Sequence, residues 1–203
     1  MRNIVIFRIK NIAGGHLIIL LLLVVLAYSN TFHASWHLDD ITKHVDNKNV
    51  HVSTLSLDNW INSIRPPFTD PSNPKPGLSG IYRPVAMLTF AFNWYLGGAN
   101  VFGYHLVNIG IHCVNSCLLF LVIFSLLRTP KVIDRYQESA YFIAIVATAL
   151  WALHPINIQA VTYIVQRMAC LAAFFYLTGI FLFLNRVMAL ITTSSVQLFG
   201  SRS

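Results

Sequence analysis

The stretch YHLVNIGIHCVNSCLLFLVIFSLL, residues 104–127, decides the class of fold. It contains no Asp, Glu, Lys or Arg. An α-helix rises about 1.5 Å per residue, so about 20 such residues cross the hydrocarbon core of a bilayer. The stretch therefore predicts a transmembrane helix.

Three more apolar blocks predict transmembrane helices at residues 12–30, 139–153 and 158–184. His154-Pro155 separates the last two blocks, because proline removes a helix hydrogen bond. The first block follows three basic residues and also fits a signal peptide. We expect an uncleaved anchor, because later spans follow it. We therefore expect an all-α integral membrane domain of about four spans over residues 1–186.

The composition indicates that much of the protein surface faces lipid rather than water. Hydrophobic residues make up 56% of the 203 residues and charged residues 10%, with a mean hydropathy of +0.62. Soluble domains carry about 25% charged residues. The net charge is +7, but no Lys/Arg run forms a phosphate-binding stripe, which argues against a nucleic-acid partner. The three cysteines lie in apolar segments and lack metal-site spacing.

A large loop, residues 31–103, follows the first span. It contains five of the seven acids of the chain. Within it, SLDNWINSI predicts a short helix that starts near Ser56 or Asp58. Residues 84–97 are apolar and aromatic but too short to span, so they predict an interfacial or half-inserted helix. The last residues, 187–203, are expected to form an unstructured tail.

The basic residues predict the orientation. With four spans, the N-terminus, the 128–135 turn and Arg186 lie on one side of the membrane, and the large loop lies on the other. The positive-inside rule makes the first side cytoplasmic. The loop is then periplasmic or lumenal, for a bacterial inner membrane or an endoplasmic reticulum.

The pair Asp39-Asp40 is the first candidate for chemistry. It lies about ten residues after the first span, so it stays near the membrane surface. Paired carboxylates act as a general base or bind a divalent metal. The alternative is a pair of solvated loop residues that cap a helix. No cofactor is expected, with a divalent metal on this pair as an open alternative.

Four polar residues recur at helical spacing in the 104–127 block, which places them on one face. Such a stripe is costly against lipid, so it faces the protein interior or a wet cavity. The alternative is interhelical hydrogen bonding that holds the bundle together. The residues are His105, Asn108, His112 and Asn115.

Two arginines are candidates for binding phosphate. Arg167 is the only charge in the fourth block before its end, and an intramembrane arginine is a functional candidate. Its guanidinium can bind a lipid-linked phosphate with two hydrogen bonds. Arg83 precedes Pro84 and can pair with a phosphate or an acid of the loop. Snorkelling for Arg167 and surface anchoring for Arg83 are the alternatives.

Four strings, in this order, resemble the transmembrane O-mannosyltransferases that carry tetratricopeptide repeats. They are HLDD with a following Asn, YRPVAMLTFAFN with Gly97-Gly98 after it, YHLVNIGIHCVN, and LHPINIQAVTYIVQR. Together they cover about residues 28–180. Each piece is short, and their order around the same spans makes the resemblance specific.

The resemblance implies a GT-C type glycosyltransferase with a polyprenyl- or dolichyl-phosphate sugar as donor and a protein or glycan as acceptor. It implies that Asp39 or Asp40 is the base that deprotonates the acceptor hydroxyl. It also implies inversion at the anomeric carbon, with the lipid phosphate leaving. The implied donor-phosphate and substrate-binding residues are Arg83, His105, Asn108, His112, His154 and Arg167.

The chain departs from that family in length. Members have more spans and then the repeats, whereas this sequence shows about four spans and no repeat. We therefore expect a truncated, N-terminal portion of such an enzyme, with an incomplete site. A noncatalytic membrane scaffold and a small transporter, in which the polar stripe lines a path, are the rival hypotheses.

Overall fold

The computed structural model describes residues 2–37, 39–41, 45–64 and 83–200, and side chains between residues 15 and 191 of these. Within these ranges the regular structure is all helical, with no strand, which confirms the predicted fold class. The α-helices are α1 (Arg2–Tyr28), α2 (Leu57–Ser63), α3 (Pro84–Gly97), α4 (Val101–Leu127), α5 (Ile133–Tyr136), α6 (Ala140–Ala152), α7 (Ile158–Thr162) and α8 (Arg167–Gly200). The 3₁₀ turns are η1 (Ser29–His33), η3 (Lys48–Val50), η4 (Pro155–Asn157) and η5 (Ile164–Gln166).

Three segments in the described part of the chain are long and apolar enough to cross a membrane: Gly15–His33, Val101–Leu127 and Ile164–Ile191. A fourth candidate is the broken pair Ala140–Ala152 and Pro155–Thr162, bent by 50°. The prediction of about four spans in a membrane protein is therefore confirmed.

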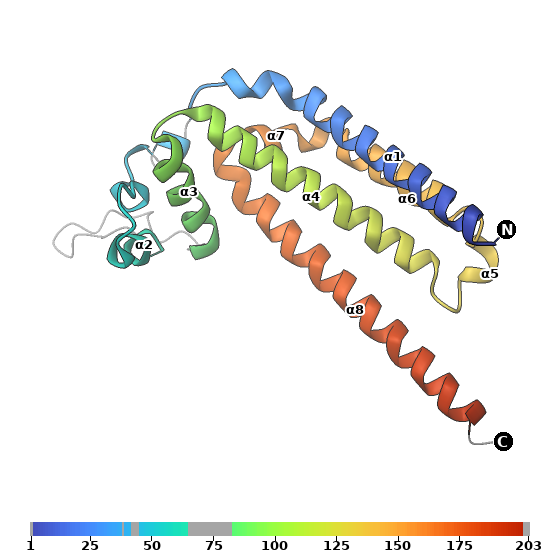
Figure 1. The fold of residues 1–203 in the computed structure, drawn as a ribbon. Coiled ribbons are helices and arrows are strands. Elements are labelled where there is room, and N and C mark those ends of the chain that lie inside the picture. Colours follow the sequence, from blue (N-terminus) through green and yellow to red (C-terminus); the bar gives the residue numbers. More distant parts are fainter. Residues whose placement is uncertain (1, 38, 42–44, 65–82, 201–203) are drawn as a thin grey trace.

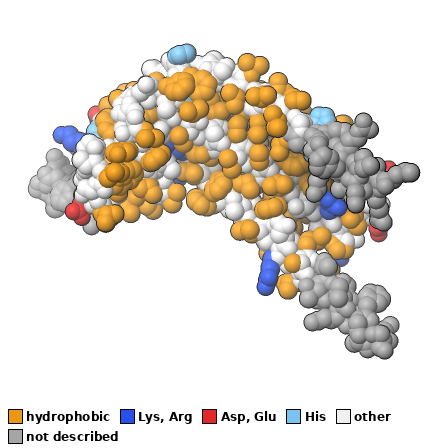
Figure 2. Space-filling view, viewed as in Figure 1, with side chains coloured by type: hydrophobic (Ala, Val, Ile, Leu, Met, Phe, Trp, Pro, Cys, Tyr) orange, Lys and Arg blue, Asp and Glu red, His pale blue; other side chains and the backbone are white. Residues whose placement is uncertain are grey.

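The long helices form a bundle that opens at one end (Figure 1). Helices α1, α4 and α6 run side by side, with α5 and the start of α1 at one end and α2 and α3 at the other. Helix α8 contacts α4 near its own start and then diverges from it. Figure 2 shows hydrophobic side chains over much of the visible surface, as expected for a surface that faces lipid.

Two clusters of buried apolar side chains hold the elements together. The first joins α1, α4, α6 and α7, and the second joins η3, α3, α4, η5 and the start of α8. Both lie toward the end of the bundle where α3 is found. Their buried members are Leu20, Val24, Tyr28, Ile109, Ala152 and Val161 in the first, and Val50, Ala86, Met87, Phe90, Tyr104, Ile164, Val165 and Met168 in the second.

The fourth predicted span differs from the structure. We expected one helix over residues 158–184, but α7 ends at Thr162. Tyr163 is extended, with φ −82° and ψ 117°, and α8 begins at Arg167 after η5. The break is stabilised by side chains from distant parts of the chain, which a local pattern does not show.

The predicted unstructured tail is wrong for residues 187–200, because α8 continues to Gly200. Residues 187–199 contain neither Pro nor Gly, so nothing in the local sequence stops the helix. Residues 201–203 lie outside the described part of the chain, and so do residues 65–82 of the predicted large loop, which include its Pro-rich stretch.

The turn between α3 and α4 contains two neighbouring glycines, and we expect alanine substitutions at the two positions to differ in their effect on stability. Gly98 has φ 56° and ψ −129°, a conformation that L side chains rarely adopt, whereas Gly97 is helical. We expect Gly98→Ala to destabilise the protein by about 1–2 kcal/mol. Gly97→Ala is the control, because its added Cβ meets only the Asn100 Cβ at 4.0 Å. Thermal unfolding in detergent measures both; equal melting temperatures would contradict the prediction.

Candidate functional site

The Asp39-Asp40 pair lies against the break between α7 and α8. The Asp40 carboxylate accepts hydrogen bonds from the backbone N–H of Val165 at 2.7 Å and of His37 at 3.2 Å. The backbone N–H of Asp39 donates to the Tyr163 hydroxyl at 3.0 Å. Asp40 is buried and Asp39 is exposed. The two carboxylates therefore have different environments, and only Asp39 has the exposure that a base acting on an external acceptor needs.

Burial raises the pKa of the Asp40 carboxyl above its usual value, while the hydrogen bonds from His37 and Val165 oppose that shift. A raised pKa means that the folded state holds this proton at pH values where the unfolded state has lost it. The stabilising effect of this proton is thus fully present below about pH 3.8, the ordinary value, and is lost as the pH rises through the folded-state pKa.

This predicts a pH-dependent difference between the wild type and Asp40→Asn. The asparagine loses one of two backbone hydrogen bonds, a cost that does not change with pH. We expect the stability of the wild type relative to the variant to fall as the pH rises from about 3.8, and then to level off. Melting temperatures of both proteins from pH 3 to 8 measure this; parallel curves would refute it.

Asn108, in the middle of the polar stripe on α4, bonds to the same break. Its side-chain NH₂ lies 3.3–3.4 Å from the carbonyl oxygens of Val161, Tyr163 and Ile164. Its side-chain oxygen accepts a hydrogen bond from Arg167 Nε at 2.7 Å. The Asn108 side chain thus donates to backbone carbonyls that have no helical N–H donor, because α7 ends there.

Arg167 is buried at the first position of α8, with 0% of its surface exposed. It donates to the Tyr104 carbonyl at 2.9 Å and to the carbonyl and hydroxyl of Thr89 at 3.2 and 3.3 Å. Its guanidinium also lies 4.4 Å from the centre of the Phe90 ring. These partners, together with Asn108, are neutral and join α3, α4 and α8. In this conformation the guanidinium is enclosed by the protein rather than facing a cavity or the headgroups.

The other members of the stripe bond to backbone carbonyls as well. His105 Nε2 donates to the Ala34 carbonyl at 3.2 Å and His112 Nε2 to the Ala152 carbonyl at 2.9 Å. Asn115 donates to the Cys170 carbonyl at 2.9 Å. Ala152 is the last residue of α6, so its carbonyl has lost its helical partner. The stripe therefore does what the hydrogen-bonding alternative required: it joins α4 to backbone groups of neighbouring segments, and at Ala152 and the α7–α8 break these groups are carbonyls freed where a helix ends.

The remaining candidate residues lie on the outside. Arg83 is exposed just before α3, and its Nη1 lies 3.0 Å from the Sδ of Met168. Met168 is the residue that follows Arg167. His154 is exposed between α6 and η4, where its Nδ1 accepts from the backbone N–H of Ile156. Thus Asp39, Asp40 and Arg83 all lie around the start of α8, whereas His112 and His154 lie around the end of α6.

The described residues contain no group of three His, Cys, Asp or Glu side chains that could hold a metal ion. A site on Asp39 and Asp40 would also use a carboxylate whose two oxygens already accept backbone hydrogen bonds, at Asp40. Among the described residues, no third side chain of these types therefore joins the pair as a ligand.

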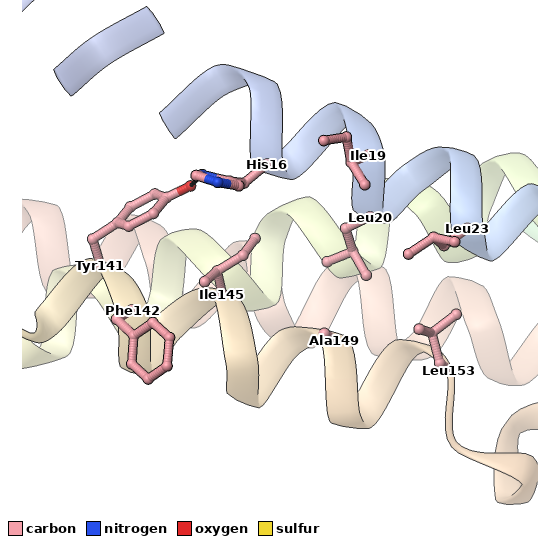
Figure 3. A pocket seen from close by; sticks show the side chains of 9 residues that line it. All are labelled: His16, Ile19, Leu20, Leu23, Tyr141, Phe142, Ile145, Ala149 and Leu153. Atoms are coloured by element: carbon pink, nitrogen blue, oxygen red, sulfur yellow. Dashed lines mark hydrogen bonds between the residues drawn. The ribbon is translucent and has the colours of Figure 1, made fainter. Parts of the chain in front are cut away.

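A groove that is lined by none of the candidate residues is shown in Figure 3. It runs between α1 and α6, and His16 and Tyr141 at one end share a hydrogen bond of 3.2 Å. The rest of its lining is apolar, as Figure 3 shows for Ile19, Leu20, Leu23, Phe142, Ile145, Ala149 and Leu153.

Two residues of the junction were not singled out from the sequence. Thr89 bonds to Arg167, and Tyr28 donates to the Ala152 carbonyl at 3.3 Å beside His112. A hydroxyl in an apolar helix was the available signal for Thr89, because a buried hydroxyl needs a partner. Tyr28 resembles an ordinary interfacial aromatic residue in sequence.

The chain is similar to curated proteins named protein O-mannosyl-transferases. It is 30% identical over 157 residues to TMTC3 of Homo sapiens, covering 77% of this chain and 15% of that protein. It is 30% identical over 165 residues to Tmtc3 of Drosophila melanogaster, covering 76% and 17%. It is 39% identical over 105 residues to human TMTC1, covering 52% and 11%. The chain thus spans less than a fifth of the length of these relatives.

No protein-family model matches the chain, and no solved structure matches it. The similarity to the curated proteins confirms the resemblance found in the four sequence strings.

Proposed function

We propose that this chain forms the N-terminal membrane portion of a GT-C-like O-mannosyltransferase, which transfers a sugar from a polyprenyl- or dolichyl-phosphate donor to a hydroxyl of a protein or glycan acceptor. The observation that carries the proposal is the placement of Asp39: exposed, next to a buried Asp40 that is anchored on the α7–α8 break. The similarity to proteins named protein O-mannosyl-transferases supports the class of reaction.

The reaction divides the roles of the two aspartates. The acceptor oxygen attacks the anomeric carbon and inverts it, while the bond from that carbon to the lipid phosphate breaks and the phosphate leaves with the electron pair. Asp39 takes the proton of the acceptor hydroxyl. Asp40 fixes the backbone of the pair through Val165 and His37, so that Asp39 stays beside the start of α8.

The two arginines also take different roles. Arg83, exposed at the start of α3, is the candidate to bind the donor phosphate. Arg167 acts from inside: by bonding to Thr89 of α3 and Asn108 of α4, it fixes the helix that carries Arg83 against the bundle. Three residues of the polar stripe then hold together the segments that carry the site: His105, Asn108 and His112.

The site lies on the extracytoplasmic side in this proposal, periplasmic or lumenal, with the N-terminus cytoplasmic. The basic 128–135 turn and the start of α1 share one end of the bundle, and α2 and α3 lie at the other (Figure 1). That arrangement supports the assignment by the positive-inside rule.

The test is sugar transfer in membranes that contain the chain, from a radiolabelled polyprenyl-phosphate mannose to a hydroxyl-bearing acceptor peptide. We expect product with inverted anomeric configuration and a loss of product in Asp39→Asn. A wild type without transfer, or equal transfer in the variant, would contradict the proposal and favour a noncatalytic scaffold. The transporter hypothesis has less support, because the stripe that would line its path is buried and bonded to backbone.

A further inference from the structure

The groove between α1 and α6 is apolar along its length and polar at one end (Figure 3). It has a volume of about 280 Å³, and its lining on α6 extends from Tyr141 to Leu153. At about 1.5 Å per residue, this part of α6 is about 18 Å long. The hydrocarbon core of a bilayer is about 30 Å thick. The groove therefore matches a hydrocarbon chain from one leaflet.

The polar end of the groove can donate a hydrogen bond to an anion. His16 of α1 is exposed, and its Nδ1 lies 3.2 Å from the Tyr141 hydroxyl of α6. When the hydroxyl donates to Nδ1, the proton of the neutral ring is on Nε2, which can donate to an oxygen atom of a ligand. A protonated ring adds a positive charge at the same place.

This polar end lies at the basic end of the bundle. The start of α1 and the short helix α5, which precedes Tyr141, are found there together (Figure 1). The first ten residues and residues 128–138 contain six Lys or Arg in all, against two acids, Asp134 and Glu138. The excess of cations favours a ligand with an anionic head group.

We propose that the groove binds an anionic phospholipid, with an acyl chain between α1 and α6 and the phosphate at His16. In the orientation proposed above, the lipid comes from the cytoplasmic leaflet, which carries the anionic surface charge. The site is separate from Asp39 and does not depend on sugar transfer. A lipid that binds only the folded chain also stabilises it, so the melting temperature should rise with lipid concentration.

Two pairs of variants test the two ends of the groove. Ala149 lines the apolar part, and Ala149→Leu narrows it. Ala147→Leu is the matched control, because Ala147 is also a half-buried alanine of α6 but is not part of the lining. His16→Phe keeps a ring and removes the donor. His33→Phe is its control, because His33 is an exposed histidine of η1, beyond the other end of α1.

The experiment is native mass spectrometry of the chain in detergent, with equal amounts of phosphatidylglycerol and phosphatidylcholine that carry the same acyl chains. We expect the wild type to retain one phosphatidylglycerol with a preference of about tenfold, as for one hydrogen bond to a charged group. His16→Phe should abolish this preference. Ala149→Leu should weaken retention about tenfold, since it excludes about two methylene groups. Both control variants should behave as the wild type does.

Equal retention of the two lipids by the wild type would mean ordinary bilayer lipid and would overturn the proposal. Equal effects within either pair of variants would overturn it as well, because the loss would then not come from the groove. Dimers that dissociate in Ala149→Leu would assign the groove to a second copy of the chain instead. The melting temperatures with and without phosphatidylglycerol check the same site, because the rise expected for the wild type should disappear in His16→Phe.

Discussion

Replacing Asp39 with asparagine is expected to lower the rate of sugar transfer by about 10²–10⁴-fold, the usual contribution of a general base. Asparagine has the same shape and offers an acceptor oxygen but cannot take up the proton of the attacking hydroxyl. The fold should not change, because the hydrogen bond that joins residue 39 to Tyr163 uses the backbone N–H. Transfer rate and melting temperature, measured on the same preparation, separate the two effects.

Asp58→Asn is the matched control. Asp58 is also an exposed aspartate of the loop, in the first turn of α2. We expect it to leave the transfer rate within about twofold of the wild type, since it lacks the position beside the α7–α8 break. A similar loss in both variants would mean that the net charge of the loop matters rather than a base at Asp39.

Replacing Arg167 with methionine is expected to disrupt the junction of α3, α4 and α8. The change leaves the side-chain oxygen of Asn108 buried without its donor, and it removes the hydrogen bond to the Tyr104 carbonyl, which lies inside α4. A buried acceptor without a donor costs about 1–3 kcal/mol, against a total stability of about 5–15 kcal/mol for an ordinary domain. Arg167→Lys should be intermediate, because an ammonium cannot reproduce the planar set of donors.

The buried thiol of Cys170 reports this unfolding. It is 5% exposed and lies in the first turn of α8. In a background with alanine at Cys113 and Cys117, the temperature at which a thiol reagent reacts with Cys170 should fall by many degrees in Arg167→Met. Arg186→Met, an exposed arginine on the same helix, should leave it unchanged. Equal reactivity curves for the two variants would show that the Arg167 contacts contribute little.

Local signals in the sequence predicted the helix positions well where they were strong. Helix α3 has the predicted bounds, because Pro84 suits a first helical position and Gly97-Gly98 suits an end. Helix α6 ends before His154-Pro155, as a proline requires. Helix α2 starts after Ser56, where the cap residue was expected.

Contacts between distant segments could not be predicted in this way. No Pro or Gly marks the break at Tyr163. The break is stabilised by hydrogen bonds with Asp40 and Asn108, which lie 125 and about 55 residues away in sequence from the groups they bond. The same holds for Arg167. Alone, an arginine near a helix start suggests snorkelling, whereas its actual partners come from α3 and α4.

The buried Arg167 also has a consequence for the order in which the protein enters the membrane. An arginine within a lone apolar helix adds about 2.5–3.5 kcal/mol to the free energy of insertion. Its acceptors Thr89, Tyr104 and Asn108 all precede it in the chain, so the ribosome makes them first. Helix α8 can therefore enter the bilayer against an α4 that is already in place, and residues 167–191 fused alone behind a reporter should insert less efficiently than the same residues behind α3 and α4.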